Sequence, residues 1–127
     1  FRRSCADIND LYAKYSDRAH IIILYTVEAH AADSSWPAAY SVDEKGNPIN
    51  QPKIYEERLK LARKTILDQE IDTVVLVDEI DNPVWCTYGP APNIAYLIGK
   101  DGKIVAKQGW FDGVRMEMSI LAYFEER

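Results

Sequence analysis

The sequence contains few cysteines, no basic stripe and no long apolar run. Its 127 residues include only Cys5 and Cys86. These are too few and too far apart for a disulfide framework or a zinc site. The net charge is −5, with Lys and Arg scattered among the acids, so nucleic acid is not an expected partner. The longest apolar run, Ile21 to Tyr25, is too short to cross a bilayer, and no signal-peptide pattern precedes it. The compartment stays open between the cytoplasm and an exported location.

The composition that remains suits one folded domain. Apolar residues make up 47% of the chain and aromatic residues 11%, which is enough for a single core. We therefore expect one domain over residues 1–127. Because the chain opens on Phe1 rather than on Met, we expect a piece of a longer protein that is incomplete at its N-terminus.

Helical and strand patterns alternate along the chain. The elements expected in order are a helix over residues 4–17, a strand over 21–26, a helix from 52, a strand over 73–77, a short helix over 83–89, hairpin strands over 93–98 and 103–107, and a helix after 113. The continuous apolar runs of the first two strands predict strands that are covered on both faces. The long polar connection from Ala31 to Pro52 is of a kind that carries function or moves.

This order predicts an α/β protein with a mixed sheet and helices on both faces. It is the thioredoxin order without its first strand. The fold class we expect is therefore a thioredoxin-like three-layer α/β/α domain with a C-terminal antiparallel hairpin, in which strands 21–26 and 73–77 are parallel neighbours.

The clearest candidate site lies where the first strand ends. Tyr25, Glu28 and His30 place a phenol, a carboxylate and an imidazole there, at the sheet edge where ligands and chemistry collect in open α/β folds. In an extended segment, Glu28 and His30 would point to the same side, so that the carboxylate would orient the imidazole as a proton relay requires. The alternative is that His30 merely caps a loop and Glu28 is solvated.

Several segments together resemble the iodothyronine deiodinase family. In chain order, the matching segments are Tyr25-Thr26-Val27-Glu28-Ala29-His30 followed by Asp33 and Trp36, then Glu57-Arg58-Leu59, Val77-Asp78, Asp81-Asn82, Tyr88-Gly89 with Pro92, and Tyr96-Leu97-Ile98 with Asp101-Gly102-Lys103-Ile104-Val105. The resemblance covers nearly the whole chain. It implies a redoxin-type thioredoxin fold.

The resemblance also implies a reactive selenocysteine or cysteine just before Phe1, at the amino end of the first helix. There, the helix dipole and free N–H groups would favour the anion. The family's proton-handling residues correspond to Tyr25, Glu28 and His30. The resemblance further implies substrate contacts at Trp36, Arg58 and Pro92, with Pro92 a candidate cis proline; outside that likeness it reads as an ordinary strand-entry proline.

The implied activity is a thiol- or selenol-dependent oxidoreductase that acts on a small molecule by reductive dehalogenation or by peroxide or disulfide reduction. No bound cofactor is expected, and an external thiol of the thioredoxin or glutathione type would be the reductant. The thyroid-hormone site of this family also uses a second histidine, shortly before the second helix. The corresponding segment here, Asn50-Gln51-Pro52-Lys53, has no histidine, which argues against an iodothyronine as the substrate. The competing hypothesis is a non-catalytic thioredoxin-like module that presents the Trp36–Asn50 loop to a partner protein.

The remaining candidates are cysteines and aromatic residues. Cys86 is a possible resolving thiol, although its apolar neighbourhood favours structural burial. Cys5 lies on the core stripe of the first helix, so we expect it to pack inside. Four aromatic residues either line a pocket or cover the core: Trp36, Tyr40, Trp110 and Phe111.

Overall fold

The structure is a computed structural model that describes residues 2–89 and 92–126. In chain order, the elements are the 3-10 turn η1 (Arg2–Ser4), α1 (Cys5–Tyr15), β1 (Ile22–Tyr25), α2 (Tyr55–Asp68), β2 (Val74–Val77), α3 (Pro83–Tyr88), β3 (Ala95–Ile98), β4 (Ile104–Gln108) and α4 (Gly113–Glu125). They follow the predicted order, and the mixed α/β class is confirmed. No helix in the described ranges has the length and apolar character needed to cross a membrane.

The chain forms two compact units. One consists of Phe1–Ile22, Gln69–Val74 and Gly89–Arg127, and the other of Ile23–Asp68 and Val75–Tyr88. The first unit therefore holds α1, α4 and the β3–β4 hairpin. The second holds α2, α3, the long 31–52 loop and most of β1 and β2.

The strands pair as two small sheets in the part of the chain that the structure describes. β1 and β2 are parallel neighbours, as predicted. β3 and β4 form the predicted antiparallel hairpin, in which Tyr96 pairs with Lys107. Gly102 supplies the positive φ of 78° that the turn requires. The single mixed sheet of a three-layer fold is not confirmed.

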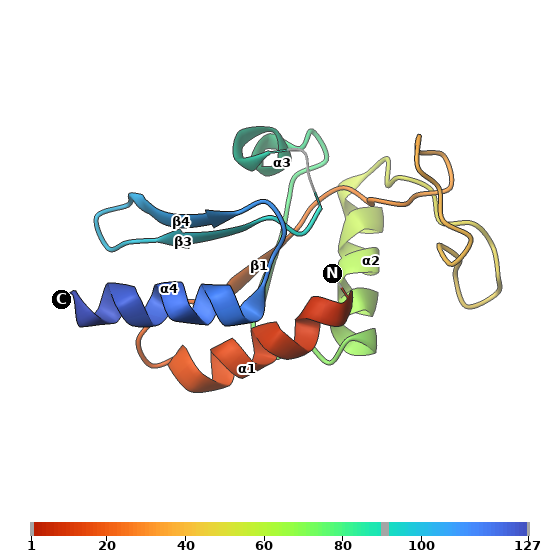
Figure 1. The fold of residues 1–127 in the computed structure, drawn as a ribbon. Coiled ribbons are helices and arrows are strands. Elements are labelled where there is room, and N and C mark those ends of the chain that lie inside the picture. Colours follow the sequence, from red (N-terminus) through yellow and green to blue (C-terminus); the bar gives the residue numbers. More distant parts are fainter. Residues whose placement is uncertain (1, 90–91, 127) are drawn as a thin grey trace. The chain divides into compact units, whose positions relative to one another are not determined.

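The core of the first unit lies between its two long helices and the hairpin. Leu11 of α1 packs with Met116 and Ile120 of α4, and each is at most 5% exposed. Figure 1 shows α4 lying along the β3–β4 hairpin, with α1 beside it. The helices approach closely where α4 begins, because a Cβ on Gly113 would lie 2.7 Å from the Cβ of Asp7. The start of α4 therefore needs a glycine.

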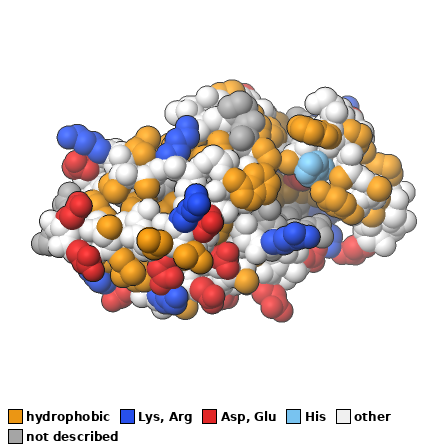
Figure 2. Space-filling model, viewed as in Figure 1, with side chains coloured by type: hydrophobic (Ala, Val, Ile, Leu, Met, Phe, Trp, Pro, Cys, Tyr) orange, Lys and Arg blue, Asp and Glu red, His pale blue; other side chains and the backbone are white. Residues whose placement is uncertain are grey.

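Hydrophobic side chains also reach the surface, as the orange areas of Figure 2 show. In β1, Ile22 and Leu24 are 49% and 42% exposed, and in β2, Val74 and Leu76 are 55% and 49% exposed. The prediction that both strands are covered on both faces is therefore wrong. A continuous apolar run contains no polar alternation, so it cannot tell which face stays open.

A polar contact joins α1 to α4 beside the apolar core. The Tyr15 hydroxyl donates a hydrogen bond to Glu117 Oε1 at 2.8 Å, and Lys14 Nζ lies 2.9 Å from the same oxygen. The Lys14 and Tyr15 hydrogen bonds hold the pKa of Glu117 below its ordinary value. A carboxyl group with a lowered pKa stabilises the folded state above its unfolded pKa, and that stabilisation is lost as the pH falls through the folded value.

We expect Glu117→Gln to lower the free energy of unfolding at neutral pH and to lower it less at strongly acidic pH, where Glu117 is already protonated. Urea unfolding at the two pH values measures the difference. The effect is small, because Lys14 is 54% exposed. The control is Glu125→Gln on the exposed end of the same helix. Equal stability of Glu117→Gln and the wild type at neutral pH would contradict the assignment.

Candidate functional site

The second unit brings polar residues together where β1 and β2 end. β1 ends at Tyr25 and β2 at Val77. The Asp78 N–H donates to the Tyr25 carbonyl at 2.8 Å, which holds the two strand ends side by side. The side chains that follow are therefore positioned at the carboxyl edge of a parallel pair.

Tyr25 and Glu28 form a hydrogen-bonded pair at this edge. The Tyr25 hydroxyl donates to Glu28 Oε1, and both side chains are half-buried. Burial and the negative charge of Glu28 raise the pKa of Tyr25 above the ordinary tyrosine range. Burial also raises the pKa of Glu28, against the opposing effects of the Tyr25 hydrogen bond and the positive charge of Arg58. The pair therefore retains protons to a higher pH than the same groups do in water.

His30 does not join this pair. Its Nδ1 lies 3.1 Å from the carbonyl oxygen of Trp36, and its ring meets Tyr40 edge-on at 6.0 Å. Among the described residues, no hydrogen bond joins Glu28 to His30, so the predicted carboxylate–imidazole unit is wrong. The chain bends at Val27 and turns at Ala29 and His30, and the two-residue alternation of an extended strand does not apply there.

Arg58 is the largest fully buried side chain in the described residues, with 2% exposure. Its Nη1 donates to the carbonyls of Asp78 and Glu79 at 3.2 and 2.5 Å, and its Nη2 donates to Asn82 Oδ1 at 2.7 Å. Only Nε finds no acceptor among the described residues. The resemblance implies that Arg58 contacts the substrate, but its terminal nitrogens bind the chain itself.

Asp78, whose carbonyl binds Arg58, also binds the start of α3 through its carboxylate. Its carboxylate accepts hydrogen bonds from the N–H groups of Val84 and Trp85 at 3.1 and 2.9 Å. These N–H groups lie in the first turn of α3, where they have no acceptor within the helix and where a carboxylate stabilises the helix. In the sequence, Asp78 stands out only as part of the Val77-Asp78 segment. An Asp shortly before an Asn-Pro helix start was the available signal.

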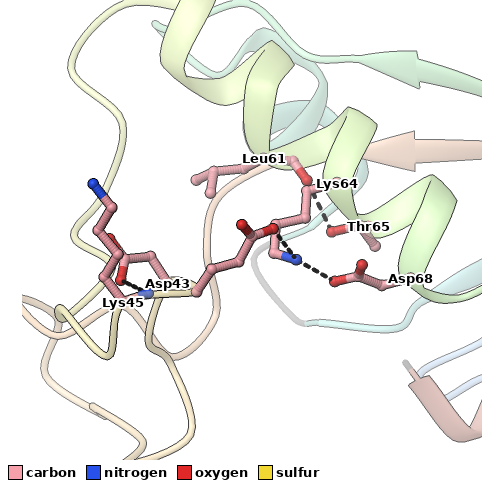
Figure 3. A network of polar contacts seen from close by, with 7 residues as sticks. Asp43, Lys45, Leu61, Lys64, Thr65 and Asp68 are labelled. Atoms are coloured by element: carbon pink, nitrogen blue, oxygen red, sulfur yellow. Dashed lines mark hydrogen bonds and ion pairs between the residues drawn. The ribbon is translucent and has the colours of Figure 1, made fainter.

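The 31–52 loop is folded and tied to α2. Asp43 accepts hydrogen bonds from the N–H groups of Lys45 and Asn47 at 2.8 Å each, which hold the turn at Glu44 and Lys45. In Figure 3, Lys64 of α2 reaches Asp68 and the loop; its Nζ lies 3.4 Å from Glu44 Oε1. At the far end of the loop, Gln51 hydrogen-bonds to the backbone of Glu28. This role of Gln51 could not be predicted from the sequence, because a glutamine before Pro52 forms no motif.

The two cysteines differ from each other in burial. Cys5 begins α1 at 4% exposure, and burial raises the pKa of its thiol, so its predicted packing role is confirmed. Cys86 is exposed on α3, and the expectation of structural burial is wrong. The six-residue helix α3 has no buried residue, so the side that carries Cys86 faces the solvent.

The remaining predicted contacts lie at the surface or at the edge of the described chain. Trp36 and Tyr40 are 79% and 63% exposed, so neither covers a core. Phe111 packs against the core of the first unit, whereas Trp110 is 63% exposed. Pro92 is exposed, and the peptide bond before it includes Ala91, so the cis-proline prediction lies outside the described residues. In residues 2–89 and 92–126, no cluster of His, Cys, Asp or Glu is placed to hold a metal ion.

We expect Arg58→Met to lower the free energy of unfolding by about 3 kcal/mol or more, because the acceptors at Asp78, Glu79 and Asn82 lose their donors. Arg58→Lys restores only part of the loss, since an ammonium group cannot reproduce the planar fork of donors. The control is Arg63→Met on the exposed face of α2, which we expect to change stability by less than about 0.5 kcal/mol. Equal losses of unfolding free energy at Arg58 and Arg63 in urea unfolding would show that the hydrogen bonds of Arg58 to Asp78, Glu79 and Asn82 do not stabilise the fold.

Comparison with known families adds no assignment. No protein-family model matches the chain.

Proposed function

We propose that this chain belongs to a thiol- or selenol-dependent oxidoreductase resembling the iodothyronine deiodinases. The observation that carries the proposal is the half-buried Tyr25–Glu28 pair at the carboxyl edge of β1. The proposed fold is a thioredoxin-like three-layer α/β/α domain. The element order, the parallel β1–β2 pair and the β3–β4 hairpin support that fold.

In the proposed reaction, a cysteine or selenocysteine N-terminal to Phe1 attacks the halogen of a small molecule. The carbon–halogen bond breaks, its electron pair stays on carbon, and carbon takes a proton. Two external thiols then return the nucleophile to its reduced form, release the halide and leave as a disulfide. With a peroxide, the nucleophile bonds to one oxygen while the oxygen–oxygen bond breaks, and the other oxygen keeps the electron pair, takes a proton and leaves as water or an alcohol. The same two external thiols then reduce the oxidised nucleophile, release its oxygen as water and leave as a disulfide.

Glu28 is the proposed proton donor. A carboxyl group with a raised pKa is protonated nearer to neutral pH, as general acid catalysis requires. The Tyr25 hydroxyl can donate to the ionised carboxylate and accept from the protonated one, so it holds Glu28 in place through the cycle.

We expect Glu28→Gln to lower kcat by about 10²- to 10⁴-fold in the protein extended N-terminally to include the proposed nucleophile, and to remove one limb of its pH–rate profile. Tyr25→Phe lowers kcat because Glu28 loses its partner. The chain offers a matched control pair, since Tyr15 also donates to Glu117 at 2.8 Å. Tyr15→Phe and Glu117→Gln should leave kcat and the pH profile unchanged. Turnover that is indifferent to Glu28 and Tyr25 would contradict the proposal.

Residues 1–127 alone should show no turnover, because Cys5 is buried and the proposed nucleophile precedes Phe1. The assay compares this chain with a version extended by about thirty residues, enough for one strand of typical length and its turn. Activity in the short chain that Cys86→Ser abolishes would instead place the chemistry at the exposed Cys86.

A non-catalytic binding module is the second candidate. It is favoured by the exposure of Trp36 and Tyr40, at 79% and 63%, since aromatic side chains of this kind anchor protein interfaces. The residue that the parent gene encodes at the proposed nucleophile position, just before Phe1, distinguishes the two. A cysteine or selenocysteine codon supports the enzyme, whereas Ser, Ala or Gly supports the binding module.

A further inference from the structure

The side chain of Gln51 forms two hydrogen bonds with the backbone of Glu28. Its Oε1 accepts from the Glu28 N–H at 3.0 Å, and its Nε2 donates to the Glu28 carbonyl. A backbone N–H can only donate and a carbonyl can only accept, so these partners determine the orientation of the amide. Gln51 therefore satisfies both backbone groups of one residue, as a neighbouring strand would.

Gln51 is itself held by the loop. Its N–H donates to Asp33 Oδ1 at 2.8 Å. Close by, the Ala32 N–H donates to the Ile49 carbonyl at 2.8 Å. Pro52 follows directly and restricts the backbone after Gln51. The position of Gln51 is thus fixed by contacts to the start of the loop and by the proline that precedes α2.

We propose that Gln51 is a positioning residue that keeps the Glu28 carboxyl group half-buried against Tyr25, and that Asp33 in turn positions Gln51. The groups that face the carboxyl group are Tyr25 from β1 and the positive charge of Arg58 from α2. We call the two hydrogen bonds from the Gln51 side chain to the Glu28 backbone the clamp. Its role in catalysis rests on the proposed function. The positioning itself does not.

The clamp has a measurable consequence, because burial is the main cause of the raised pKa of Glu28. Because the clamp fixes the backbone of Glu28, it also fixes the direction in which the side chain leaves the chain, next to Tyr25. Without the clamp, the carboxyl group becomes solvated and its proton is lost at a lower pH. A role confined to loop stability would not change this titration selectively.

Carbon-13 NMR titration of the Glu28 side-chain carboxyl in residues 1–127 tests the proposal. We expect Gln51→Met, which has similar length but no hydrogen-bonding amide, to shift the Glu28 pKa down toward its ordinary value. Asp33→Ala gives a smaller shift in the same direction. Asp33→Asn keeps the Oδ1 acceptor and restores wild-type behaviour. The control is Asp43→Ala, which removes comparable hydrogen bonds within the loop turn and should leave the Glu28 pKa unchanged.

An unchanged Glu28 pKa in Gln51→Met overturns the proposal, and so does an equal shift in Asp43→Ala. Circular dichroism checks that each variant is folded. If Gln51→Met does not fold, the contrast between Asp33→Ala and Asp33→Asn decides. The titration needs no turnover, so it fails or succeeds separately from the proposed function, which fails when kcat is indifferent to Glu28.

Discussion

The second unit depends on a buried guanidinium group. Arg58 is 2% exposed, and removing a charge from water is costly unless its donors are satisfied. The backbone after β2 satisfies the terminal donors through the carbonyls of Asp78 and Glu79. Because those carbonyls must point at α2, the charge determines where β2 ends. Asn82, with a positive φ of 61°, accepts a hydrogen bond from Nη2 through its side chain.

The candidate site follows from that constraint. Once Asp78 is held by Arg58, its N–H ties the end of β1 through the Tyr25 carbonyl, and its carboxylate caps α3. Glu28 then lies in the field of Arg58, which lowers the Glu28 pKa while burial raises it. The site thus balances two opposing effects on one carboxyl group. Gln51 keeps the balance in place by holding the Glu28 backbone.

Apolar runs and periodicity, together with the turn signals between them, predicted the order of the α-helices and strands in the described residues. They could not predict what depends on contacts distant in sequence. The partners of Arg58 lie 20 or more residues along the chain, at Asp78, Glu79 and Asn82, and Gln51 is joined to Glu28 across 23 residues. The error at His30 is local, since a turn replaced the extended backbone that the argument assumed. Tyr25 and Glu28 were found because they follow a strongly apolar strand.

The most direct measurement is the titration of the Tyr25 phenol by carbon-13 NMR, in residues 1–127 and in Glu28→Gln. The account predicts that Tyr25 stays protonated above the ordinary tyrosine range, because burial and the Glu28 charge both oppose its ionisation. Removing that charge in Glu28→Gln should bring its pKa down. A Tyr25 phenol that titrates in the ordinary range, and that is indifferent to Glu28→Gln, would contradict the account.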